Sequence, residues 1–254
     1  MKTRYLFLVL MSGAIAALSP SLHARTDAKT RNEAALINTQ LGITYMRQGN
    51  LQAAREKIEK ALDQNPHTAQ TQQAAGFLYD RLGDDKKAKS HFEQAVKLGQ
   101  DDPEVINNAA VYFCRKGERK LGEKYFLQAA GSALYKTPEV AYTNAGRCAR
   151  ADGRTEDAEK YFRKALTFQS EQPDALLQLA DMFQETGRSA QARPFLQRHL
   201  AAVPATSSAL WLGYRIERSL GDTAAAEEYA QRIKMEFASS AEVQDLIEAE
   251  RNGQ

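Results

Sequence analysis

The sequence predicts an all-α solenoid of about six helix hairpins that ends in a capping helix. Isolated glycines recur at intervals of 34, 34, 36, 34 and 34 residues: Gly49, Gly83, Gly117, Gly153, Gly187 and Gly221. Small residues follow each glycine by five positions: Ala54, Ala88, Gly122, Ala158, Ala192 and Ala226. Two sets of residues that share one period are typical of stacked helical repeats. Because one short hairpin cannot bury its apolar face alone, each hairpin requires its neighbours.

The segment 38–66 shows the hairpin pattern most clearly. Apolar or small residues recur at three- and four-residue intervals on both sides of the turn at Gly49: Leu41, Gly42, Tyr45, Ala54, Ile58 and Ala61. This spacing predicts a helix, a tight turn and a second helix. Gly42 and Ala54 are small because the two helix backbones must approach closely, and Pro66 ends the second helix.

The remaining hairpins follow the same period, and proline marks several boundaries between them. We place the repeats at about 35–68, 69–102, 103–138, 139–172, 173–206 and 207–240. The two extra residues lie around 131–137, in a longer connection after the third hairpin. The segment 241–251 predicts the capping helix, with Val243, Leu246 and Ile247 facing the array.

The first residues have the pattern of a secretory signal peptide. Lys2 and Arg4 precede an apolar run over 5–18, and Ala24 offers a small residue for cleavage, so we expect a signal peptide over 1–24. The alternative is a membrane anchor, but the run is shorter than the roughly 20 residues that a spanning helix needs. We expect 25–31 to be a flexible polar lead and 32–254 to form the repeat domain.

Charge and composition exclude several classes of function. Residues 1–24 contain two basic residues and no acidic one, so the rest of the chain has 32 basic and 32 acidic residues. A net charge of zero gives no global electrostatic case for binding nucleic acid. No later segment reaches the length of a transmembrane helix.

The sequence offers no constellation that would support catalysis or a cofactor. The four histidines (His23, His67, His91 and His199) have no zinc-type or triad spacing, and we expect His91 to be a surface residue. No glycine-rich phosphate loop is present. Paired acids at 84–85 and 101–102 fit helix capping better than a metal site. We therefore predict no enzyme activity, no cofactor, no metal and no small-molecule substrate.

Two cysteines, Cys114 and Cys148, lie near the ends of the first helices of adjacent repeats. An oxidising compartment permits a disulfide between them. We expect their Cα separation to exceed the roughly 7 Å limit for bridging, which favours two partly buried thiols.

The period and residue types resemble the tetratricopeptide repeat. The segment 41–66 matches its signature most fully, and a set around 75–95 is nearly as complete: Ala75, Gly76, Tyr79, Ala88, Phe92 and Ala95. The resemblance implies a right-handed superhelix whose first helices line a concave groove. Groove positions carried across the hairpins include Thr39, Gln73, Asp80, Asn107, Thr143, Arg147, Arg150, Leu177, Asp181 and Gln184.

Apolar side chains at the N-terminal groove positions predict the main partner-binding surface. They are Leu36, Ile43, Met46, Phe77 and Val111, which suit an apolar peptide or an amphipathic helix. The alternative is that a helix or lead of the chain itself covers this strip. Trp211, Arg215 and Arg218 form a secondary candidate contact, although Trp211 could equally be a packing residue.

The repeats, the export signal and the cap together resemble the type IV pilus biogenesis and stability proteins of the pilotin-like PilF/PilW family. The most specific stretches are 105–108, 134–135 and 208–216. The resemblance implies a periplasmic scaffold at the inner face of the outer membrane that binds the pilus secretin, aids its localisation and multimerisation, and so supports twitching motility. The alternative is a general cell-envelope adaptor with a different client.

One departure from that family concerns the membrane. Members commonly carry a lipobox cysteine directly after the apolar run, whereas 17–20 reads ALSP here. A lipid anchor is therefore not supported, and we expect membrane association only through the partner.

Overall fold

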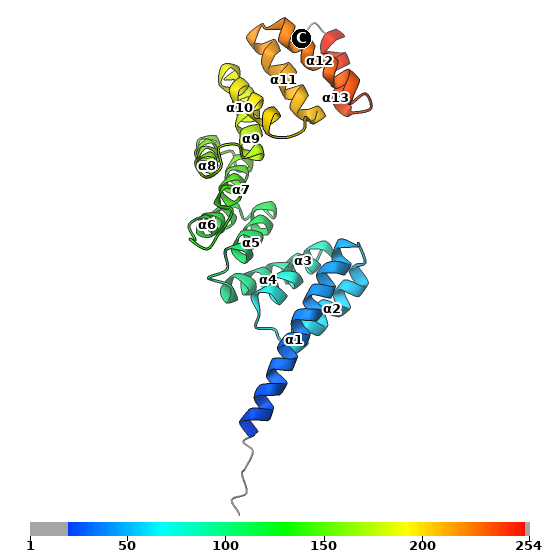
Figure 1. The fold of residues 1–254 in the computed structure, drawn as a ribbon, viewed down its shortest axis with the longest axis vertical. Coiled ribbons are helices and arrows are strands. Elements are labelled where there is room, and N and C mark those ends of the chain that lie inside the picture. Colours follow the sequence, from blue (N-terminus) through cyan, green and yellow to red (C-terminus); the bar gives the residue numbers. More distant parts are fainter. Residues whose placement is uncertain (1–19, 252–254) are drawn as a thin grey trace, which may run out of the picture. The chain divides into compact units, whose positions relative to one another are not determined.

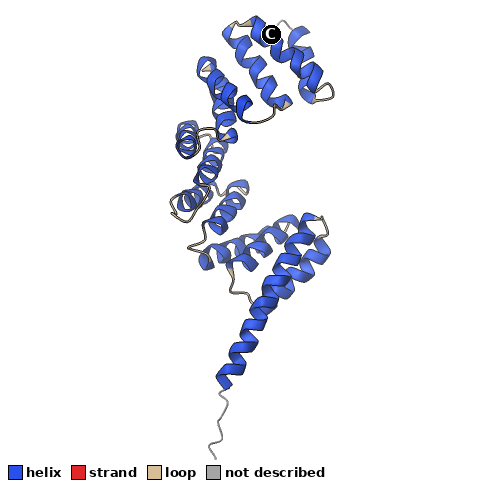
Figure 2. Ribbon diagram, in the orientation of Figure 1, coloured by secondary structure: helices blue, strands red, loops and turns tan. Residues whose placement is uncertain are grey.

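A computed structural model describes residues 20–251, and within this range the chain forms thirteen helices and no strand (Figures 1 and 2). The helices form consecutive antiparallel pairs, which confirms the predicted all-α solenoid of hairpins. By its contacts the chain divides into two compact units, residues 1–66 and residues 67–254.

The first unit is one hairpin of α1 (Pro20–Arg47) and α2 (Leu51–Gln64). The Asn50 side chain accepts a hydrogen bond from the Ala53 amide at 3.1 Å and so caps α2. Gly42 is small for the predicted reason, because a Cβ there would lie 2.5 Å from Ile58 Cδ1. Ile58 itself is fully buried.

Helix α1 begins earlier than the sequence pattern suggested. It starts at Pro20, so the expected flexible lead 25–31 is helical. That lead has no hydrophobic periodicity, but it also contains no proline or glycine that would end a helix. Residues 1–19 of the expected signal peptide lie outside the described part of the chain.

The second unit contains five hairpins and a final helix. Its helices are α3 (Ala69–Arg81), α4 (Asp85–Leu98), α5 (Pro103–Arg115), α6 (Arg119–Ala130), α7 (Pro138–Ala151), α8 (Thr155–Phe168), α9 (Pro173–Glu185), α10 (Ser189–Ala202), α11 (Ser207–Leu220), α12 (Thr223–Glu236) and α13 (Ala241–Arg251).

The periodic glycines lie in the turns inside the hairpins. All six have φ between +71° and +86°, the left-handed region that favours glycine. The first acidic pairs also act as expected. Asp84 and Asp102 accept hydrogen bonds from backbone amides at the starts of α4 and α5, and so cap these helices.

Helix α13 closes the array. Val243 and Leu246 are buried against residues of α11 and α12, including Leu210 and Ile233. Ile247, which we expected to face the array, is 41% exposed. Next to Leu246 in sequence, it points about 100° away on the helix and so misses the packed face.

Cys114 and Cys148 form a disulfide, which corrects the expectation of two thiols. Their Cα atoms are 5.8 Å apart, inside the bridging limit. The axes of packed helices lie about 8–10 Å apart and Cα atoms lie about 2.3 Å from each axis, so directly facing Cα atoms can approach to about 3–5 Å and nearly facing ones stay below about 7 Å. The two cysteines occupy such facing flanks of α5 and α7. Within the described residues no helix is both long and apolar enough to cross a membrane.

Candidate partner-binding surface

The first helices of the hairpins form one continuous layer in the second unit. Each of α3, α5, α7 and α9 contacts the next first helix along the chain, up to α11. The second helices (α4, α6, α8, α10 and α12) contact first helices but not one another. In a curved stack the inner elements lie closer together, so the first helices form the inner layer of this unit.

Two predicted groove residues, Phe77 and Val111, lie on this inner layer. Val111 on α5 is 41% exposed. Phe77 on α3 is only half-buried, and its ring packs edge-to-face on Phe92 with centroids 5.1 Å apart. Val111 is therefore free to contact a partner, whereas Phe77 also supports the core of its own hairpin.

The three predicted residues of the first unit differ in exposure. Leu36 is 61% exposed and Ile43 is half-buried, but Met46 is 5% exposed and is not available to a partner. The structure adds two exposed apolar residues on α1 that the prediction omitted, Ile37 and Leu41. The spacing of Leu41 from Tyr45 matches a buried helical face, and for this reason the sequence predicts that Leu41 packs within the hairpin.

Charged positions on the inner layer hold neighbouring repeats together. Asp80 on α3 forms ion pairs with Arg115 and with Lys116, the latter at 3.3 Å. Arg147 on α7 pairs with Asp174 on α9 at 3.2 Å. These predicted groove residues therefore connect consecutive hairpins.

Arg150 on α7 is the most connected of these residues. Its guanidinium lies 2.7 Å from Asp181 and 2.6 Å from Glu185, and it donates a hydrogen bond to Gln178 at 3.0 Å. Burial lowers the pKa of Arg150, but the hydrogen bonds to the two carboxylates raise it overall. The 31-residue spacing from Arg150 to Asp181, close to one repeat, is the sequence signal that could have predicted this pair.

The secondary candidate residues lie on α11. Trp211 is half-buried, and its ring stacks on Tyr214 with centroids 5.2 Å apart. Arg215 is half-buried and Arg218 is exposed. Trp211 therefore packs against its own helix and still presents part of its ring.

His91 is not the free surface residue that we expected. Its ring is half-buried, stacks on Tyr79 with centroids 5.3 Å apart, and shares a 2.7 Å hydrogen bond between Nδ1 and Gln72 Oε1. Since an amide oxygen only accepts, Nδ1 carries the proton in this contact. Burial, and then the charge of Lys87, lower the pKa of His91.

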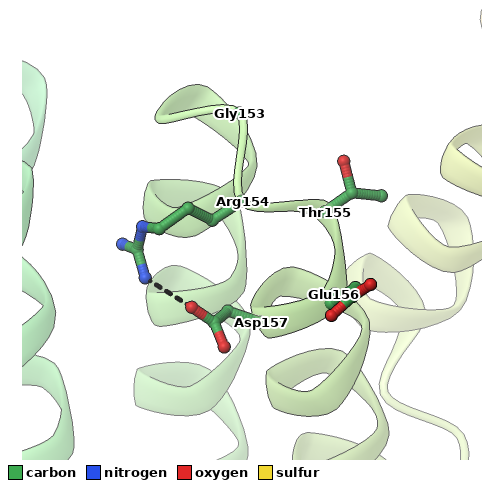
Figure 3. Close-up of a pocket in the computed structure, with 5 residues that line it drawn as sticks. All are labelled: Gly153, Arg154, Thr155, Glu156 and Asp157. Atoms are coloured by element: carbon green, nitrogen blue, oxygen red, sulfur yellow. Dashed lines mark hydrogen bonds and ion pairs between the residues drawn. The ribbon is translucent and has the colours of Figure 1, made fainter.

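A shallow hollow at the start of α8 contains one cation, Arg154, and that cation is paired (Figure 3). Arg154 reaches along it to Asp157 at 2.8 Å, while Thr155 and Glu156 point to the other side. Arg154 also pairs with Asp152 at 3.0 Å and with Glu123. The hollow offers no free cation to a ligand, and the described residues contain no cluster suited to a metal ion.

Comparison with protein-family models identifies the type of repeat. Two models of the tetratricopeptide repeat match the chain, over residues 33–101 and 149–213. The chain is a tetratricopeptide repeat protein. The two matches cover repeats at both ends of the array, as the period of the turn glycines predicts.

Proteins of type IV pilus biogenesis match most of this chain. The type IV pilus assembly protein PilF of Pseudomonas aeruginosa is 25% identical over 222 residues, which cover 87% of this chain and 88% of PilF. A solved structure of PilW, described as a widely conserved type IV pilus biogenesis factor, is 29% identical with a TM-score of 0.75, covering 85% of this chain and 99% of PilW. A solved PilF structure from P. aeruginosa shares the fold, with 24% identity, a TM-score of 0.73 and coverage of 87% and 99%. The chain is thus homologous to PilF.

Proposed function

We propose that the chain is a non-enzymatic scaffold of type IV pilus biogenesis. In this role it binds the pilus secretin, helps it reach the outer membrane and promotes its assembly into multimers. The homology to PilF carries the proposal, because it extends over 87% of this chain and 88% of PilF rather than over the repeats alone.

Within each unit, a first helix exposes an apolar residue that suits a protein partner. Leu36 on α1 and Val111 on α5 expose 61% and 41% of their surface, although both are large apolar residues. Exposed apolar side chains on one face of a helix suit an apolar peptide or the apolar face of a partner helix. The ion pairs at Asp80, Arg147 and Arg150 hold the inner layer of the second unit in a fixed arrangement, which reduces the entropy lost on binding.

We place this activity in the periplasm, at the inner face of the outer membrane. The basic residues and apolar run at the start of the sequence support export. Since 17–20 offers no lipobox cysteine, the scaffold is expected to meet the membrane through the secretin.

Deletion of the gene in the organism that carries it tests the proposal. We expect loss of twitching motility, and secretin monomers in place of multimers on gels that preserve the assembled ring. A plasmid copy of the gene should restore both. Normal multimers in the deletion strain would contradict the proposal and would favour a general envelope adaptor with another client.

A further inference from the structure

Arg215 stands out among the cations of the inner layer of the second unit. The five first helices of this unit contain six arginines and no lysine. Arg115, Arg147 and Arg150 pair with acidic residues, and Arg81 and Arg218 are also engaged. Arg215 makes no side-chain hydrogen bond, ion pair or ring contact with any described residue. The residue as a whole is half-buried, and none of its nitrogens is among the buried unpaired atoms, so the guanidinium is accessible to a partner.

The repeat explains why Arg215 lacks an acid. Arg215 occupies the position of Arg147 two hairpins later in the array. Arg147 pairs with Asp174, the second residue of the next first helix. The equivalent acid for Arg215 is Glu242, the second residue of α13.

Glu242 is used differently from Asp174. The backbone at the start of α13 lowers the pKa of the Glu242 carboxylate. Within the described part of the chain, Glu242 forms no ion pair with Arg215. The acid at the repeat-equivalent position therefore does not neutralise Arg215.

Trp211 gives the position of Arg215 a second recognition element. It lies one helical turn before Arg215, on the same face of α11, and its ring is half-buried. A guanidinium one helical turn from an aromatic ring suits an acidic residue that is followed or preceded by an apolar one.

We propose that Arg215 and Trp211 form a binding subsite for an acidic segment of a partner protein. The Asp or Glu carboxylate of the segment accepts hydrogen bonds from two N–H groups of Arg215. It takes the position that the acid of a further repeat would occupy. An adjacent apolar side chain of the segment packs on Trp211. The subsite does not depend on the secretin being the partner.

Trp211 is the only tryptophan of the chain, so its fluorescence reports on this subsite directly. The probe is a capped hexapeptide of alternating glutamate and leucine, titrated into the full-length mature protein, with a glutamine–leucine peptide as its neutral match. We expect a saturable change in emission with the glutamate peptide and roughly tenfold weaker binding of the glutamine peptide, as for hydrogen bonds to charged groups. Added salt should weaken binding of the glutamate peptide and leave binding of the glutamine peptide unchanged.

Variants assign the effect to one residue. Arg215→Gln should weaken binding of the glutamate peptide roughly tenfold. The control Arg232→Gln removes an arginine of α12, outside the inner layer, and should leave the affinity unchanged. Equal affinity for the two peptides, no effect of Arg215→Gln, or no saturable change at millimolar peptide would each overturn the proposal. None of these results bears on secretin assembly, which the deletion strain tests separately.

Discussion

Cys114 on α5 and Cys148 on α7 are joined by a disulfide between two consecutive hairpins, 34 residues apart in the sequence. Because each hairpin of a solenoid contacts only its neighbours, a covalent bond at this junction restrains the unfolded chain over one whole repeat. Replacing both cysteines with alanine should lower the free energy of unfolding by about 2–4 kcal/mol, as measured by urea denaturation.

The same experiment has an internal control. A reducing agent should destabilise the wild-type protein by a similar amount and have no effect on the double alanine variant. Equal stability of the wild-type protein with and without reductant would show that the disulfide contributes nothing to the fold.

Arg150 should matter more to stability than Arg147, although both connect α7 to α9. The Arg150 side chain is 22% exposed and meets two carboxylates, whereas Arg147 is 46% exposed and meets one. We expect Arg150→Ala to lower the free energy of unfolding by about 1–2 kcal/mol, since it removes the pairing of Asp181, which is partly buried, and of the exposed Glu185. Arg147→Ala should cost less than about 0.5 kcal/mol. Thermal unfolding of the two variants compares them, and the reverse order would refute the stabilising role of Arg150.

Gly146 provides a test in which packing and helix propensity predict opposite signs. It lies within α7, where alanine would by itself stabilise the helix by about 1 kcal/mol. A Cβ at this position would lie 2.5 Å from Cε1 of Phe162, a fully buried ring that cannot move into solvent. Overpacking of this kind costs about 1–3 kcal/mol, so we expect Gly146→Ala to be destabilising in urea denaturation. A more stable variant would mean that the two helices can separate without loss.

His91 should make stability depend on pH in mildly acidic solution. Burial lowers the pKa of His91 in the folded protein below the ordinary value of 6.5. The unfolded chain then binds a proton more readily, so folding stability falls as the pH drops from 6.5 towards the folded pKa. His91→Gln should flatten the dependence of the unfolding midpoint on pH in this window. An unchanged dependence of the unfolding midpoint on pH would mean that groups other than His91 cause the acid sensitivity. The charges of Lys87 and Asp84 also act on the pKa of His91.

The turns and helix pairs could be predicted from the sequence because they depend on local chemistry. A glycine with positive φ at each of six equivalent positions sets the period, and the period sets the helix bounds. The disulfide and the ion pair of Arg150 depend instead on which flanks of neighbouring helices face each other. That information comes from the crossing of the helices, which periodicity along one helix does not contain.

Only part of the candidate surface could be predicted, again because helical spacing does not show which faces pack together. Met46 and Leu41 are both large apolar residues of α1, yet Met46 is buried and Leu41 is 40% exposed. Helical spacing alone places a residue on a face but does not say where the packed face ends. Leu36 and Val111 remain the exposed members of the predicted set.

Calorimetry of the purified mature protein with the periplasmic region of the pilus secretin tests the proposed scaffold role. We expect saturable binding that is at least tenfold weaker for a Leu36→Asp, Val111→Asp double variant, because a carboxylate on each exposed apolar position opposes an apolar partner. Both side chains are exposed, so helical circular dichroism should be unchanged in the variant. Absence of saturable binding by the wild-type protein, or equal binding by the variant, would contradict the account.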